Sequence, residues 1–145
     1  MIKIICVGKI KEKYLSDLIN DYKLRISKYH KIDIIELKDN DINTESNEIL
    51  KVLNPKDYNI YMDIKGEKLN SIELSSLIND VFLNGYGNIS FIIGGSNGVN
   101  DEVKRFVNKR ISISDMTFPH GLFRGILLEQ IYRSFKILNN ESYHK

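Results

Sequence analysis

The sequence predicts a single α/β domain built around a parallel β-sheet. Short apolar runs rich in β-branched residues alternate along the chain with segments whose apolar residues recur at helical spacing, and this alternation is typical of parallel α/β folds. The length of 145 residues fits one compact domain. An apolar fraction of 42% and a charged fraction of 28% are those of a soluble globular protein.

The first part of the chain is expected to form a strand, a helix and a second strand. The apolar run Ile2–Val7 is closed by Gly8, which is typical of a buried strand. Glu12–Tyr29 predicts an amphipathic helix, because its apolar residues recur at helical spacing. Lys31–Lys38 alternates and then becomes apolar, which predicts the second strand.

The next segment is more polar and then becomes apolar again. Asp39–Glu48 is almost wholly polar, so we expect a loop that leads into a short helix. That helix should end near Leu53, because Pro55 disfavours its continuation. Tyr58–Ile64 predicts a third strand, closed by Gly66.

The rest of the chain continues the alternation. A helix is expected at Ser71–Phe82, with Ser71 as its N-cap. A buried strand that begins at Ile89 follows. The remaining elements are expected to be a helix at Asp101–Asn108, a fifth strand at Arg110–Ser114, a loop at Met116–His120 and a last helix at Leu122–Leu138.

The most informative stretch is Ile89–Gly98, an apolar strand that empties into a loop with three glycines, Gly94, Gly95 and Gly98. Such a loop lets backbone approach a ligand closely, and ligands of α/β sheets lie beyond the carboxyl ends of strands. The loop lacks the lysine of a phosphate-binding P-loop, and carboxylates follow at Asp101 and Glu102. These features favour a neutral or cationic ligand over a polyphosphate. A plain helix start after a tight turn is the alternative.

Other classes of site find little support. The three histidines, His30, His120 and His144, are far apart in sequence, so no metal site is expected. The glycine spacing around Ser96 differs from that of a hydrolase nucleophile elbow. The single Cys6 fits a core position in a reducing compartment. No signal peptide or membrane span is visible, which predicts a cytoplasmic protein.

The last helix and the residues after it carry two further signals. Apolar residues cover more than one face of Leu122–Leu138, which predicts a partner subunit, unless the helix is buried wholly within one chain. The chain ends in Tyr143-His144-Lys145, which is either a frayed end or a group able to stack on a base and contact phosphate. Cations that would suit an RNA backbone are Arg124, Arg133 and Lys136 on the last helix and Lys104, Arg105, Lys109 and Arg110 before it.

Five segments together resemble the RlmH family of ribosomal large-subunit methyltransferases. They are Val7–Tyr14, Phe91–Gly98, Met116–His120, Glu129–Arg133 and Tyr143–Lys145, and they match in order from end to end. The resemblance implies the SPOUT class of α/β-knot folds, with a parallel sheet and a C-terminal trefoil knot. It also implies a homodimer that uses S-adenosylmethionine to methylate N3 of a pseudouridine in 23S rRNA within assembled ribosomes, without a metal.

The resemblance also implies two sets of site residues. The predicted catalytic group has His120 or His144 near the base, Tyr143 stacking, and cations for phosphate or anion stabilisation: Arg124, Arg133 and Lys145. The predicted cofactor residues come from the ends of three strands and the loop after the last of them: Met62, Gly94, Gly95, Ile113, Ser114, Asp115, Met116, Thr117 and Phe118.

The chain departs from the family pattern in two places, and two rival functions remain. Asp39–Asn54 is shorter than expected, and Gly121 and Gly125 predict a late start of the last helix.

One rival function is that of a non-catalytic RNA- or ribosome-binding module, which needs no cofactor loop. The other is a flavodoxin-like nucleotide enzyme, which Asp101 and Glu102 disfavour.

Overall fold

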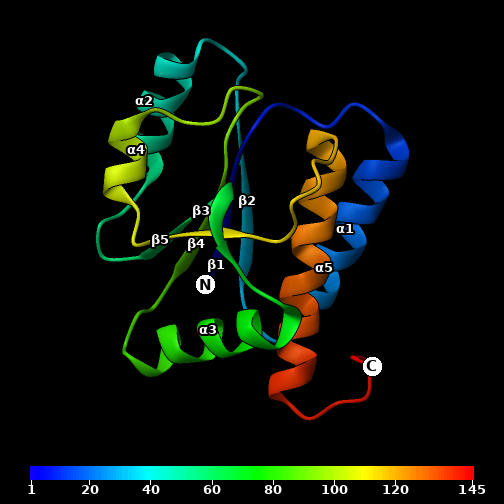
Figure 1. Ribbon diagram of the computed structural model, residues 1–145. Coiled ribbons are helices and arrows are strands. Elements are labelled where there is room, and N and C mark those ends of the chain that lie inside the picture. Colours follow the sequence, from blue (N-terminus) through cyan, green and yellow to red (C-terminus); the bar gives the residue numbers. More distant parts are fainter.

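The computed structural model describes residues 1–145 and contains one five-stranded sheet (Figure 1). All neighbouring strands are parallel, and their order is β2-β1-β4-β3-β5. The predicted parallel α/β class is therefore confirmed. The strands are β1 (Ile2–Val7), β2 (Ile32–Leu37), β3 (Tyr58–Lys68), β4 (Ile89–Ile93) and β5 (Lys109–Ser112).

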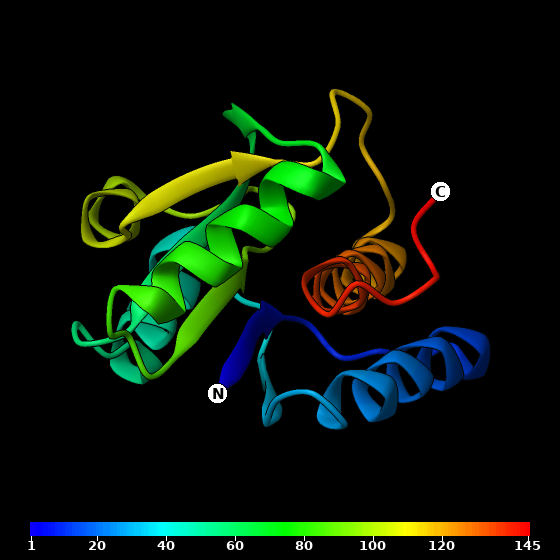
Figure 2. The same cartoon turned by 90° about the horizontal axis from the view of Figure 1, so that it is seen from below.

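Helices cover both faces of the sheet (Figures 1 and 2). One face carries α1 (Lys13–Ser27), α3 (Ser71–Leu83) and α5 (His120–Leu138), and the other carries α2 (Ile42–Val52) and α4 (Asp101–Phe106). Each face has its own apolar core. This double cover explains why the central strands β1 and β4 are apolar on both sides, as buried parallel strands are.

Helix α2 corrects the expected loop at Asp39–Glu48. The helix begins at Ile42, and the Asp41 side chain caps it by accepting a hydrogen bond from the Thr44 amide at 2.9 Å. Its buried face includes the polar residues Glu45 and Ser46, which pack toward the loop after β4 rather than facing water. Polar residues on the buried side hide the helical periodicity in the sequence.

Strand β3 is longer than expected, and the helix after it is capped one residue earlier. The strand resumes after a register shift between Met62 and Glu67 and runs to Lys68. Gly66 allows this, because a Cβ there would lie 2.7 Å from the backbone of Arg110. The N-cap of α3 is Asn70 rather than Ser71, in a capping box with Glu73.

Helix α5 begins at His120, so the expected late start is wrong. Gly121 and Gly125 lie within the helix and face α1, where Cβ atoms would come within 2.8 Å and 2.6 Å of the Leu15 and Leu18 side chains. The two glycines serve close packing between helices. The end of α4 at Phe106 and the end of β5 at Ser112 also precede the expected ends at Asn108 and Ser114.

The apolar faces of α5 are used within one chain. The helix lies against α1 on one side and α3 on the other, and it contributes Leu127, Leu128 and Ile131 to the core beneath it, all fully buried. The breadth of the apolar surface therefore gives no argument for a partner subunit. No helix is long and apolar enough to cross a membrane.

Arg124 ties α5 to the sheet. Its side chain is 3% exposed, and its guanidinium donates to Glu36 at 2.5 Å and to the Gly8 carbonyl at 3.1 Å. Glu36 belongs to β2 and Gly8 follows β1, so one side chain joins the carboxyl ends of two strands to the helix. This buried position is that of a residue that stabilises the fold.

Arg124→Met should therefore destabilise the protein, because it removes the hydrogen bonds that join α5 to Glu36 and to the Gly8 carbonyl. We expect a loss of about 1–3 kcal/mol in the free energy of unfolding, measured by urea denaturation. Arg105→Met is the matched control, because Arg105 is exposed on α4 and forms no ion pair; its effect should stay within about 0.5 kcal/mol. Equal effects of the two substitutions would contradict the structural role of Arg124.

Candidate functional site

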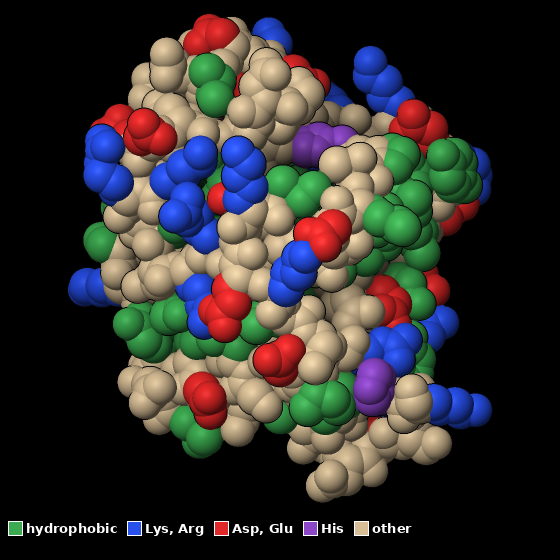
Figure 3. Space-filling view, in the orientation of Figure 1, with side chains coloured by type: hydrophobic (Ala, Val, Ile, Leu, Met, Phe, Trp, Pro, Cys, Tyr) green, Lys and Arg blue, Asp and Glu red, His purple; other side chains and the backbone are tan.

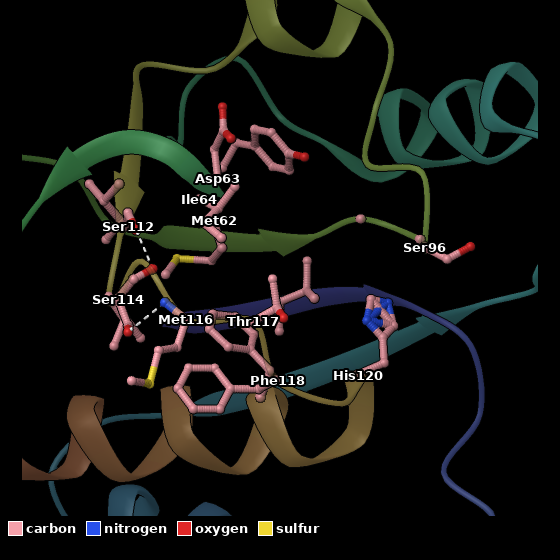
Figure 4. A pocket seen from close by; sticks show the side chains of 17 residues that line it. Met62, Asp63, Ile64, Ser96, Ser112, Ser114, Met116, Thr117, Phe118 and His120 are labelled. Atoms are coloured by element: carbon pink, nitrogen blue, oxygen red, sulfur yellow. Dashed lines mark hydrogen bonds between the residues drawn. The ribbon is translucent and has the colours of Figure 1, made fainter.

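A cavity of about 430 Å³ lies beside the middle of β3 and the carboxyl ends of β4 and β5 (Figure 4). Its size is within the range of small-molecule and cofactor sites. Four segments form its wall: the middle of β3, the end of β4 with the loop that follows, the end of β5 with the loop that follows, and the start of α5. The lining residues are Tyr61, Met62, Asp63, Ile64, Ile93, Gly94, Gly95, Ser96, Ile111, Ser112, Ile113, Ser114, Met116, Thr117, Phe118, His120 and Phe123.

The glycine loop after β4 folds tightly back on itself. Gly95 and Gly98 form an isolated antiparallel bridge, and the Gly98 amide donates to the Gly95 carbonyl at 2.9 Å. A Cβ at Gly94 would lie 3.0 Å from the Gly98 backbone and from the Val99 side chain. Gly98 has a φ of +76°, which disfavours other residues. Glycine is thus required for the shape of this loop.

The loop after β5 is held by its own serines. The Ser112 hydroxyl donates to the Ser114 carbonyl at 3.0 Å, and the Ser114 hydroxyl accepts from the Met116 amide at 3.0 Å (Figure 4). Phe118 then stacks on Phe123 of α5 with ring centroids 6.2 Å apart. These contacts place the loop along one wall of the cavity.

The charges around the cavity favour a neutral or cationic ligand. No lysine or arginine lines it, and its titratable members are Asp63, Tyr61 and His120. The Asp63 carboxylate lies 3.7 Å from the Arg110 guanidinium, outside the lining. Burial raises the pKa of Tyr61, so its hydroxyl stays protonated at neutral pH.

The neighbouring helix end does not suit a phosphate group. The Asn100 side chain caps α4 by accepting from the Val103 amide at 3.2 Å, and Asp101 and Glu102 occupy the first turn. Asn100 already accepts a hydrogen bond from a free backbone amide of the first turn, and the two carboxylates offset the partial positive charge of this helix end. The structure therefore weighs against the flavodoxin-like alternative.

The predicted cofactor residues come together with one exception. Met62, the two glycines Gly94 and Gly95, and the residues after β5 all line the cavity. Asp115 does not: it is exposed and pairs with Lys68 on the outside of the loop. Residues near the site that the sequence analysis did not select are Asp63, which directly follows Met62, and Tyr61, Phe123 and Glu45.

The predicted catalytic residues divide into two distant groups. His120 lines the cavity at the start of α5, whereas Tyr143, His144 and Lys145 follow the opposite end of the same helix (Figure 1). Because the chain end folds back, Tyr143 contacts Glu129 and His144 contacts Arg133, which lie nine and thirteen residues from His120 along the helix. This is a rise of about 14 Å and about 20 Å at roughly 1.5 Å per residue. One chain alone does not bring these groups to one site.

The final residues fold back along the second half of α5, as far as Glu129 at its middle. The Tyr143 hydroxyl donates to Glu129 at 3.0 Å, and its ring lies 5.0 Å from that of Tyr132. Arg133 bonds Glu129, lies over the Tyr143 ring at 4.7 Å and approaches His144 Nδ1 at 3.1 Å. Burial, followed by hydrogen bonds with Tyr22 and Glu129, raises the pKa of Tyr143. Tyr143 is anchored, while His144 and Lys145 are exposed.

Cys6 is a core residue. Its side chain is fully buried on β1, and burial raises the pKa of the thiol to about 11. No three histidine, cysteine or acidic side chains come together in a way that could hold a metal ion.

Comparison with known proteins identifies close relatives over the whole chain. The ribosomal RNA large subunit methyltransferase H of Acetivibrio thermocellus is 42% identical, that of Clostridium botulinum (strain Langeland) 46% and that of Fusobacterium nucleatum 45%. Each alignment covers 99% of this chain and 99% of the relative. The alignments are longer than this chain, so the relatives contain residues that it lacks.

Solved structures with low sequence identity share the fold. The tRNA (m1G37) methyltransferase from Aquifex aeolicus is 16% identical with a TM-score of 0.51, covering 91% of this chain and 69% of that one. A probable methylase family protein from Haemophilus influenzae is 10% identical with a TM-score of 0.58, covering 99% and 70%. These likenesses concern the fold alone.

The family assignment rests on the whole length of the chain. Residues 1–144 match the family described as "Predicted SPOUT methyltransferase", and the relatives at 42–46% identity match from end to end. The chain belongs to the SPOUT methyltransferase family, in the group of ribosomal RNA large subunit methyltransferase H.

Proposed function

We propose that this protein methylates N3 of a pseudouridine in 23S rRNA within assembled ribosomes, with S-adenosylmethionine as methyl donor. The observation that carries the proposal is the cavity walled by the glycine loop, which the family's methyl-transfer chemistry requires and an RNA-binding module would not. The relatives' names specify large-subunit rRNA as what they methylate. An rRNA substrate also implies a cytoplasmic location.

The residues present fit the proposed cofactor. The cavity is largely apolar, contains no lysine or arginine, and presents the Asp63 carboxylate. When bound, S-adenosylmethionine supplies a methyl group activated by a sulfonium, so no metal is needed for the transfer. Met62, Gly94, Gly95 and the residues from Ile113 to Phe118 other than Asp115 would hold it. Figure 4 shows Met62 on β3 and Ser114, Met116, Thr117 and Phe118 in the loop after β5 around the cavity.

The chain's own residues have two tasks in the reaction: to accept the N3 proton and to stabilise the anionic base. Methyl transfer to N3 would require that the N3 proton leaves. His120 at the cavity edge is a candidate to accept that proton as a neutral imidazole. A cation near the base, such as Arg133 or Lys145, would favour the anionic form of the imide. Holding the atoms in line can supply about 7–11 kcal/mol.

Both tasks can meet at one site only if two subunits contribute. The final residues are held on α5 at Glu129 and Arg133, about 14–20 Å along the helix from His120, so we propose that they complete the cavity of a partner in a homodimer. Hydrophobic side chains gather over the first turns of α1 and α5, at the upper right of Figure 3. Tyr14 in the first turn of α1 is 71% exposed, and Met116 beside the cavity is 75% exposed, which suits a contact near the site.

Gly94→Val should abolish cofactor binding, because a side chain there meets the glycine loop's own backbone. Calorimetry with S-adenosylmethionine should detect binding to the unmodified protein and none to a folded Gly94→Val variant. Ribosomes from cells that lack the enzyme should gain one methyl group at a 23S pseudouridine with the unmodified protein only. Gly87→Val is the matched control, since a Cβ at Gly87 meets no atom within 4 Å. Unchanged affinity in the Gly94 variant would place the cofactor elsewhere.

Deleting Tyr143–Lys145 should leave the fold, the dimer and cofactor binding intact and abolish methyl transfer, because the lost groups act at the reacting base. Lys145→Ala should mainly weaken ribosome binding, whereas His144→Ala should mainly lower the rate at saturating ribosomes. Single-turnover methylation and sedimentation measure these effects. Full activity of the truncated protein would show that these residues are a frayed end with no role in the reaction.

A further inference from the structure

A buried carboxylate lies directly behind the wall of the cavity. Glu45, in the first turn of α2, is only 5% exposed. An ideal Cβ on Gly95 would come 2.3 Å from Glu45 Oε1 and 3.0 Å from Oε2, so the carboxylate packs against the Gly95 backbone. Gly95 lines the cavity on its other side. Only one stretch of backbone therefore separates this carboxylate from the cavity.

The carboxylate has no cationic partner in the protein. Glu45 takes part in none of the ion pairs of the molecule, and its one protein hydrogen bond is the Asn40 amide, which donates to Oε2 at 2.8 Å. The amino end of α2 offsets part of the cost of this burial. A buried carboxylate ordinarily requires more compensation than that, from a cation or several donors.

Holding the glycine loop does not itself require a charge. Two neighbours of Glu45 on α2 already connect the helix to this region through neutral groups: the Ser46 hydroxyl accepts from the Asn100 amide at 3.0 Å, and the Asn43 side chain accepts from the Asn100 side chain at 3.2 Å. A neutral residue of the same length at position 45 could accept the Asn40 amide equally well. The negative charge is thus the feature of Glu45 that the protein's own contacts leave unexplained.

We propose that Glu45 is the counter-ion of the cofactor's cationic methionine portion and makes the cavity select a positively charged methyl donor. This inference rests on the proposed function. The methionine portion carries both cations of S-adenosylmethionine, the sulfonium and the ammonium, whereas the adenosine portion is neutral at pH 7. The carboxylate acts through the thin wall at Gly95 and is a positioning residue, without contact to the reacting atoms.

The test compares ligands that differ in charge. S-Adenosylmethionine carries both cations, and 5′-methylthioadenosine shares its adenosine and sulfur but carries neither. Calorimetry should show that Glu45→Gln weakens the affinity for the first at least about tenfold, because one charge pair at an effective dielectric of roughly 20 contributes more than this factor at separations below about 12 Å. The affinity for the second should stay within about twofold. S-Adenosylhomocysteine keeps the ammonium and the carboxylate but lacks the sulfonium, so it identifies the charge that Glu45 faces. Glu45→Gln should weaken its binding as much as that of S-adenosylmethionine if the ammonium is the partner, and should leave its affinity unchanged if the sulfonium is.

Two further variants keep the test decisive. Glu48→Gln removes a carboxylate from the exposed side of the same helix, where it pairs with Lys51, and should change neither affinity. The double variant Glu45→Ala with Gly95→Ala places a methyl group where the carboxylate was. If Glu45→Gln does not fold, this variant should show the same loss of preference for the charged ligand.

Outcomes that overturn the inference differ from those that overturn the proposed function. If Glu45→Gln lowers the affinities for S-adenosylmethionine and 5′-methylthioadenosine by the same factor, or lowers neither, Glu45 only supports the loop. If the unmodified protein binds no S-adenosylmethionine, the proposed function itself fails, whatever the Glu45 variants do.

Discussion

The length and burial of α5 determine how the rest of the site can be arranged. The helix packs between α1 and α3 over one face of the sheet, and its central residues Leu127, Leu128 and Ile131 are fully buried. Gly121 and Gly125 seat it closely on α1, and the buried Arg124 guanidinium joins it to the ends of β1 and β2. A helix fixed in this way cannot bend or slide without losing core packing. The two ends of α5 therefore stay about 27 Å apart, given its 19 residues.

This constraint gives each end of α5 a different role. The first end, with His120, forms part of the cavity beside the middle of β3 and the carboxyl ends of β4 and β5. The final residues fold back from the other end onto Glu129 and Arg133, which anchor Tyr143 and leave His144 and Lys145 exposed. A family that methylates RNA needs both a methyl-donor site and groups that engage the base. In this fold a second subunit is the direct way to unite them.

The sequence was sufficient for those parts of the fold that depend on local patterns. Apolar runs predict the five strands, and the glycines after β4 predict a ligand loop, because both features come from residues close together in the chain. The start of α2 was missed, because Glu45 and Ser46 are polar yet face the glycine loop, a contact between distant segments. Gly121 and Gly125 suggested a late start to α5 for a similar reason: their role is to admit side chains of α1. The separation of His120 from Tyr143 depends on the helix length together with the fold-back of the chain end, and only the structure provides both. The trefoil knot stays a prediction from the family resemblance.

The central claim is that each active site combines the cavity of one subunit with the final residues of the other. The most direct measurement is the methylation of ribosomes by dimers assembled from two inactive subunits, one with Gly94→Val and one lacking Tyr143–Lys145. Such a mixed dimer has one intact cavity facing one intact chain end if the site is shared. We expect co-expressed, separately tagged and doubly purified mixed dimers to regain methyl transfer, while each parent dimer stays inactive. Mixed dimers as inactive as their parents would show that each chain builds its site alone, and would contradict this account.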